Sequence, residues 1–265
     1  MKKLNELFQQ KRFDEIINIT KKYYLEKDFK NENIINFYGL ALQSKGKIKR
    51  SVEVFTKLYK KNNDNFVYIN NLATSYYILG DYESAEFYFN KTILINPKFF
   101  PSYFNLKKIK LDLGKIDEAI AILNKALDHS NDKEKITIFF EIARIHRASA
   151  NFEVAKESIN KILLLDKNHS GAHKFLSSII NYNNDSDGHL RELERVSKLT
   201  SHLEQDRINI YFALGKAYEE ILDYENSAYF YKKANSMSKN NSNYRIYELI
   251  KFAEDVKSVF NQINT

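Results

Sequence analysis

The sequence predicts an all-α protein in which helical hairpins stack into an α-solenoid. Three observations indicate this fold class. The chain has only 7 glycines and 2 prolines among 265 residues, too few for a turn-rich β architecture or for glycine-rich phosphate loops. Hydrophobic residues make up 43% of it, which is enough to form a core. Glycines recur at a constant interval, at Gly46, Gly80 and Gly114, which indicates a repeated structural unit.

Other positions keep the phase of these glycines. The best-preserved unit runs from Phe66 to Phe99. Its pattern residues are Leu72, Ala73, Tyr76, Gly80, Asp81, Tyr82, Ala85, Phe89 and Pro97. This pattern resembles the signature of the tetratricopeptide repeat (TPR), whose period is 34 residues. The resemblance implies a right-handed superhelix of two-helix units that acts as a scaffold for protein–protein interaction.

The pattern residues have a packing interpretation. Small residues should let the first helix of a unit (helix A) approach the second (helix B), and they are Gly39, Ala73, Ala85, Ala119, Ala155 and Gly215. The glycine in the middle of a unit should end helix A, because glycine adopts a left-handed C-cap at little cost. Since one hairpin cannot bury its apolar face alone, the units must stack.

We expect three segments along the chain. They are a partial N-terminal capping repeat (residues 1–31), an array of about six units (32–239) and a C-terminal helix or linker (240–265). Units are expected to begin near Glu32, Phe66, Phe100, Ile136, Ser170 and Ile208. The fourth unit starts two residues later than the 34-residue period predicts. We expect residues 129–132 to form a loop that accommodates these two extra residues.

The fifth unit is degenerate. A helix is expected over about 172–182, followed by a polar break at 183–188 and a helix over about 189–200. Beyond the array, residues 244–263 place apolar side chains at helical spacing. That spacing predicts one further helix near the C-terminus.

A narrower resemblance concerns the last unit. Residues 210–220 read Ile-Tyr-Phe-Ala-Leu-Gly-Lys-Ala-Tyr-Glu-Glu, and residues 223–225 read Asp-Tyr-Glu. Together with the segment before them, they are similar over about residues 185–240 to the last repeat of bacterial TPR-containing sulfotransferases. In that family a catalytic domain follows the repeats and transfers sulfate from phosphoadenosine phosphosulfate. The Pro-Arg-Ser-Gly-Thr-type loop that opens this domain does not occur here, and the only prolines are Pro97 and Pro101.

No catalytic residue of the sulfotransferase family can therefore be assigned to this chain. Two hypotheses about its function stay open. The first is a non-catalytic scaffold, which could be the recruiting region of a sulfotransferase. The second is the front part of a TPR-sulfotransferase whose catalytic domain is absent from this chain. The chain has no cysteine, which excludes thiolate metal sites and a cysteine nucleophile.

Two patterns could indicate a metal. Asn183, Asp185, Asp187 and Gly188, with Glu194 at position 12, resemble a calcium loop, although the same stretch is explained as the loop between two helices. His169 and His173 could share a helix face, but a metal site needs a third ligand. We expect neither a metal nor another cofactor.

The expected binding surface is the concave groove lined by the A helices. Polar residues at its lining positions are Asn36, Asn70, Asn71, Thr74, Asn105, Lys108, Arg144, Arg147 and Lys216. Asparagine amides can both donate and accept hydrogen bonds, as an extended peptide backbone requires, and the cations can bind acidic groups. The sequence therefore predicts a protein or peptide partner, although solvated polar side chains would give the same pattern.

The remaining composition bears on location and on other partners. Net charge is +7, but lysines are spread along the chain and form no block, which disfavours nucleic acid as a partner. No apolar run reaches the roughly 20 residues of a membrane span. The polar residues among the first ten interrupt any signal-peptide core. We expect a cytoplasmic protein that does not bind membranes.

Overall fold

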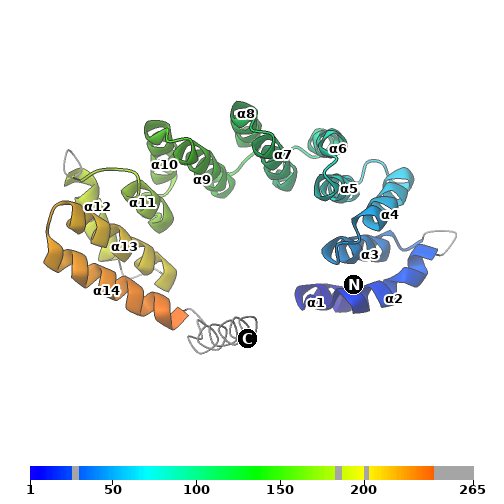
Figure 1. Cartoon of the computed structure of the whole chain (residues 1–265), viewed down its shortest axis with the longest axis horizontal. Helices are drawn as coiled ribbons and strands as arrows, with labels where there is room; N and C mark the ends of the chain where they lie inside the picture. Colours follow the sequence, from blue (N-terminus) through cyan, green and yellow to red (C-terminus); the bar gives the residue numbers. More distant parts are fainter. Residues whose placement is uncertain (26–29, 183–186, 200–202, 242–265) are drawn as a thin grey trace, which may run out of the picture. The chain divides into compact units, whose positions relative to one another are not determined.

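The computed structural model describes residues 1–25, 30–182, 187–199 and 203–241 (Figure 1). These ranges contain fourteen α-helices and no β-strand. The chain divides into two compact units, Met1–Ile145 and His146–Thr265. No helix in the described ranges has both the length and the apolar character needed to cross a membrane. The predicted all-α solenoid of helical hairpins is confirmed.

The first unit is a stack of helical hairpins (Figure 1). Its helices are α1 (Lys2–Gln9), α2 (Phe13–Leu25), α3 (Glu32–Ser44), α4 (Ile48–Lys61), α5 (Phe66–Leu79), α6 (Tyr82–Ile95), α7 (Phe100–Asp112), α8 (Ile116–Leu127) and most of α9 (Asp132–Ala148). Consecutive helices from α1 to α8 pack on one another, and α5 also contacts α3 and α7. We call the surface of α3, α5 and α7 that faces away from α4, α6 and α8 the A face.

The second unit contains the last helices of the array. They are α10 (Phe152–Leu165), α11 (Ser170–Ser177), α12 (Asp187–Ser197), α13 (Glu204–Glu220) and α14 (Tyr224–Asn241). Helix α13 is central, because it contacts α11, α12 and α14. Its buried Leu214 packs with Leu193 and Val196 of α12 in one cluster.

Two glycines allow the close helix approach that the sequence predicts. A Cβ atom at Gly39 of α3 would lie 2.6 Å from Cζ of Phe55 in α4. A Cβ atom at Gly215 of α13 would lie 2.7 Å from Cδ1 of Tyr231 in α14. Ala85 is fully buried. At these positions a larger side chain would overpack the hairpin.

The corner between helix A and helix B has a left-handed backbone, as predicted for the mid-unit glycines. Gly46, Gly80 and Gly114 have φ values of 71°, 86° and 71°. The structure adds three corners that the sequence did not reveal, because their left-handed residues are not glycine: Lys11, Ala150 and Leu222, with φ between 56° and 64°. Such residues carry backbone strain.

Two predicted unit starts are four residues too late. Helix α9 begins at Asp132 rather than near Ile136, so Asp132 belongs to the helix and not to the loop. The reason is a capping box: Asn131 Oδ1 accepts a hydrogen bond from Glu134 N, while Glu134 Oε2 accepts one from Asn131 N.

The second late start concerns α13, which begins at Glu204 rather than near Ile208. Acidic residues favour the first turn of a helix, because they interact with its positive dipole end. Glu204 and Asp206 occupy that turn. Both α9 and α13 therefore reach 17 residues.

The fifth unit is shorter than predicted. Helix α11 ends at Ser177, not near residue 182, and α12 begins at Asp187 and ends at Ser197. Ser178 Oγ donates to the carbonyl oxygen of Phe175, and Ser177 Oγ donates to that of Ala213 in α13. Serine hydroxyls that bond to backbone carbonyls favour the end of a helix. The predicted helix over 244–263 lies outside the described residues.

A chain of polar side chains joins α11 to α12. His173 Nε2 lies 2.9 Å from the carbonyl oxygen of Lys167, and His173 Nδ1 lies 3.1 Å from His189 Nε2. His189 Nδ1 lies 2.7 Å from the hydroxyl of Tyr182. A carbonyl can only accept, so neutral rings require one proton order: Tyr182 donates to His189, His189 to His173, and His173 to Lys167. We call these side chains the histidine chain.

The electrostatics of the histidine chain favour neutral rings. Burial lowers the pKa of His189 to about 3, and repulsion by His173 and Lys216 contributes. Burial also lowers the pKa of His173. An unfolded histidine has a pKa of about 6.5. Below that value the unfolded chain therefore binds more protons than the folded chain, and acid favours unfolding.

The left-handed corners generate a first prediction. Ala150→Gly should raise the free energy of unfolding by about 0.5–1 kcal/mol, because about 1–2 kcal/mol of strain is relieved and part of it is offset by the flexibility of glycine. Ala148→Gly, a control at the end of α9, should lower it. Urea denaturation followed by circular dichroism measures both. If both variants lost the same free energy of unfolding, Ala150 would not be strained.

The histidine chain generates a second prediction. Stability should fall as pH decreases from about 6.5, by at most about 1.4 kcal/mol per pH unit for each histidine. His189→Gln should flatten this dependence between pH 6.5 and 5, although it should also lower stability at pH 7. His129→Gln, at an exposed histidine, is the control and should keep the wild-type slope. An unchanged slope in His189→Gln would contradict the neutral histidine chain.

Candidate functional site

A row of asparagines crosses the A face. Asn71 Nδ2 of α5 donates a 2.8 Å hydrogen bond to Asn36 Oδ1 of α3, which lies 35 residues earlier. Asn105 of α7 lies one 34-residue repeat after Asn71. All three side chains are partly buried. Helix α5 is fixed at both ends, by the Asn65 side chain at its N-cap and by left-handed Gly80 at its C-cap. We call Asn36, Asn71 and Asn105 the asparagine row.

Asn70 lies beneath this surface, in the contact between α5 and α7. It is 8% exposed, and its Oδ1 accepts a 3.1 Å hydrogen bond from Ser102 Oγ. The other end of its amide has no hydrogen-bond partner among the described residues. Thr74 Oγ1 donates to the backbone carbonyl of Asn70 at 2.8 Å. Asn70 and Thr74 were both predicted to line the groove, and the structure ties each of them to neighbouring groups.

Lys108, one turn after Asn105 on α7, belongs to a small polar cluster. Its Nζ lies 5.0 Å from the ring centroid of Tyr77, whose hydroxyl donates a 2.7 Å bond to Asp112 Oδ2. The hydrogen bond with Tyr77 raises the pKa of Lys108, so this exposed side chain carries its charge at neutral pH. The sequence reading missed Tyr77 and Asp112. They are 35 residues apart, like Asn36 and Asn71, and this spacing was the available signal.

The remaining predicted cations are already engaged. Arg144 binds Glu141 at 3.2 Å, and Glu141 also accepts from Lys107. Arg147 and Lys216 belong to the second unit, whereas the asparagine row belongs to the first.

In the second unit, Arg147 donates to Ser178 Oγ at 3.3 Å and stacks over Phe175. Lys216 forms a 2.6 Å ion pair with Glu220 and donates to the carbonyl oxygen of Ile180. The nine predicted residues thus divide between the units, and the first unit holds seven of them.

The two sequence patterns that could indicate a metal are the His169–His173 pair and the calcium-loop pattern at 183–194. His169 is the N-cap of α11, where its ring accepts from Ala172 N, and His173 belongs to the histidine chain. Residues 183–186 of the calcium-loop pattern lie outside the described residues, and Glu194 accepts a 2.6 Å hydrogen bond from the Tyr218 hydroxyl. The described residues hold no group of three or more acidic or histidine side chains arranged for a metal ion.

Comparison with known proteins agrees with this architecture. The tetratricopeptide-repeat family model matches residues 68–99 and 100–132. No curated protein matches the sequence of this chain.

Two solved structures are similar over most of the chain. The C-terminal part of a TPR repeat-containing protein from Cytophaga hutchinsonii is 14% identical, with a TM-score of 0.62, over 89% of this chain and 94% of its own. A tetratricopeptide repeat protein from Parabacteroides merdae is 17% identical, with a TM-score of 0.52, over 94% of each chain. Likeness at such identities concerns the fold. The chain thus contains tetratricopeptide repeats, at residues 68–99 and 100–132, within an all-α solenoid of helical hairpins.

Proposed function

We propose that this chain is a non-catalytic scaffold that binds an extended segment of a partner protein along the A face. The observation that carries the proposal is the asparagine row together with its unused hydrogen-bonding capacity. The Asn105 amide is partly buried and has no hydrogen-bond partner among the described residues. An asparagine amide can both donate and accept, so the backbone of a bound segment could pair with it.

The spacing of the row suits an extended backbone. Packed helices lie about 8–10 Å apart, and three residues of an extended chain span about 10 Å. A segment that crosses α3, α5 and α7 would therefore bring one backbone amide near each helix. Each asparagine can donate and accept at once, so it can pair with a backbone carbonyl and N–H without regard to side-chain sequence.

Charge at the Tyr77 cluster adds a preference for acidic groups. Lys108 is exposed and retains its charge, whereas Arg144 is partly neutralised by Glu141. A carboxylate of the partner near Lys108 would form a charge-assisted hydrogen bond, which is about twice as strong as a neutral one. We therefore expect the partner segment to carry an acidic residue at the α7 end of the row.

One class of partner is favoured by the sequence of the second unit. Residues 185–240, which are similar to the last repeat of bacterial TPR-containing sulfotransferases, supply α12, α13 and α14. A sulfotransferase domain, on the same or another polypeptide, is the enzyme that such a scaffold would serve. The repeats alone should then bind no phosphoadenosine phosphosulfate, and a micromolar dissociation constant by calorimetry would contradict this assignment.

The A-face proposal predicts the effect of removing two asparagines of the row. The double variant Asn71→Ala/Asn105→Ala should bind a captured partner about tenfold or more weakly, because each lost hydrogen bond costs about 1 kcal/mol. Titration calorimetry measures the affinity, and circular dichroism checks that the fold is intact.

Lys60→Ala is the control, since Lys60 is exposed on α4 and away from the A face. It should change the affinity by less than about twofold. If Lys60→Ala lowered the affinity and the Asn71/Asn105 variant did not, the partner would bind another face and the proposal would be wrong.

A further inference from the structure

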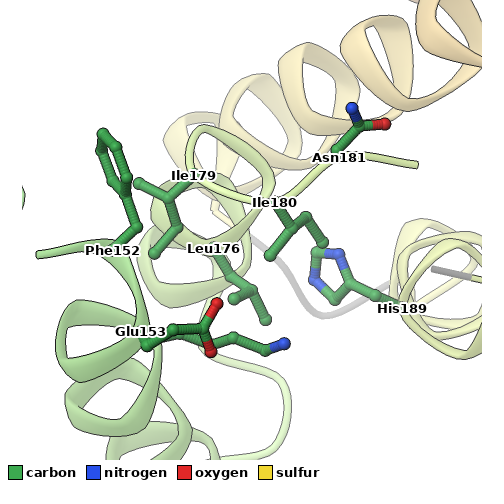
Figure 2. Close-up of a pocket in the computed structure, with 8 residues that line it drawn as sticks. Phe152, Glu153, Leu176, Ile179, Ile180, Asn181 and His189 are labelled. Atoms are coloured by element: carbon green, nitrogen blue, oxygen red, sulfur yellow. The ribbon is translucent and has the colours of Figure 1, made fainter. Parts of the chain in front are cut away.

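A separate hollow lies in the second unit, between the start of α10 and the end of α11 (Figure 2). Its volume is about 430 Å³, which falls within the range of protein ligand pockets. Its apolar wall includes Phe152, Leu176 and Ile180, and the His189 ring points into it from α12 (Figure 2). We call this hollow the α11 pocket.

The pocket sits where the repeat is incomplete. Helix α11 has 8 residues, whereas α3, α5, α7, α9 and α13 have 13 to 17. After Ser177 the chain leaves the helix through tight turns, in which the N–H groups of Ile179 and Ile180 both donate to Leu176 O. These turns carry Ile179 and Ile180 to the wall of the pocket, where a complete helix would continue.

The wall of the pocket accepts apolar groups. Both nitrogens of His189 are used within the histidine chain, by His173 and by Tyr182. The ring therefore offers its carbon atoms to the pocket and no free donor or acceptor. Phe152 is 48% exposed at the mouth, so water contacts an aromatic ring that an occupant would cover.

The mouth of the pocket carries two opposite charges. Glu153 and Lys156 are exposed residues one turn apart on α10. Neither forms an ion pair or a side-chain hydrogen bond within the part of the chain that the structure describes. They are therefore available to an occupant that brings one positive and one negative group.

We propose that the α11 pocket is a second interaction site, which takes an aromatic side chain of a partner segment flanked by one basic and one acidic residue. The aromatic ring fills the apolar hollow against Phe152 and the face of His189, as aromatic anchors do at interfaces. The basic residue pairs with Glu153 and the acidic residue with Lys156. This charge pattern distinguishes the site from a purely apolar surface.

The test uses methyl NMR spectra of the full chain with short blocked peptides. The probes are acetyl-Lys-Phe-Glu-amide and acetyl-Glu-Phe-Lys-amide, because the pocket does not fix the direction of the segment. At least one should shift the methyl signals of Leu176, Ile179 and Ile180 in a saturable manner. The matching peptides with alanine in place of phenylalanine should not.

Two substitutions on α10 form a matched pair. Phe152→Glu removes an aromatic side chain from the pocket wall, at the first position of the helix, where an acidic residue is tolerated. It should lower the affinity for the tighter-binding peptide at least about fivefold. Leu164→Glu introduces the same charge on the same helix, at a residue that is 86% exposed and outside the pocket. It should change binding by less than about twofold.

The charge pattern has its own test. Lys156→Glu should shift the preference to acetyl-Lys-Phe-Lys-amide, because both groups at the mouth would then be acidic. The proposal is overturned if no probe gives saturable shifts at these methyls, if the alanine peptides act equally, or if Leu164→Glu weakens binding as much as Phe152→Glu. Unchanged peptide preference in Lys156→Glu would also overturn the proposed charge pairing.

Discussion

The structure depends on one constraint: a hairpin cannot cover its own apolar face and must pack on its neighbour. Phe55 and Leu58 of α4 are fully buried because α5 adds Tyr68 and Leu72 to their cluster. The burial of each hairpin thus fixes the offset of the next. Stacking at a constant offset brings residues of successive first helices together at a constant sequence spacing. The Asn71–Asn36 hydrogen bond and the Tyr77–Asp112 hydrogen bond both join helices at a 35-residue spacing, one residue more than the repeat period.

The same constraint explains what happens at the fifth unit. A short α11 cannot cover the start of α10 along its length, and the α11 pocket remains there. Hydrogen bonds between side chains supplement apolar packing between the helices here. The histidine chain joins α11 to α12, and the Tyr182 backbone N–H is held by Glu220 of α13 at 3.0 Å. A departure from the repeat therefore creates both a buried polar network and a site that a regular unit would fill.

Much of the fold could be predicted because the repeat is a periodic signal. Glycines at fixed phase marked the corners at Gly46, Gly80 and Gly114 correctly. The corners at Ala150 and Leu222 gave no such signal, because tertiary packing imposes a left-handed backbone on residues that disfavour it. The early start of α9 was readable from Asn131 and Glu134, whose spacing is that of a capping box.

The candidate sites were less predictable. Asn70 and Asn71 both fit the lining pattern, but neighbouring residues on a helix point about 100° apart, and only Asn71 joins the asparagine row. The histidine chain was hidden because His173 and His189 lie on different helices, α11 and α12, and meet only in the folded chain. The pocket depends on where α11 stops, and helix ends are the least reliable feature of a sequence-based assignment.

The central claim is that the constant stacking offset builds a row of amides which holds an extended backbone on the A face. NMR cross-saturation from a bound, protonated partner to the deuterated chain tests it most directly, because it reports proximity atom by atom. The account predicts loss of intensity at the side-chain amides of Asn71 and Asn105, and none at Asn90 of α6 or Asn124 of α8. Loss at Asn90 and Asn124, with Asn71 and Asn105 unaffected, would contradict it.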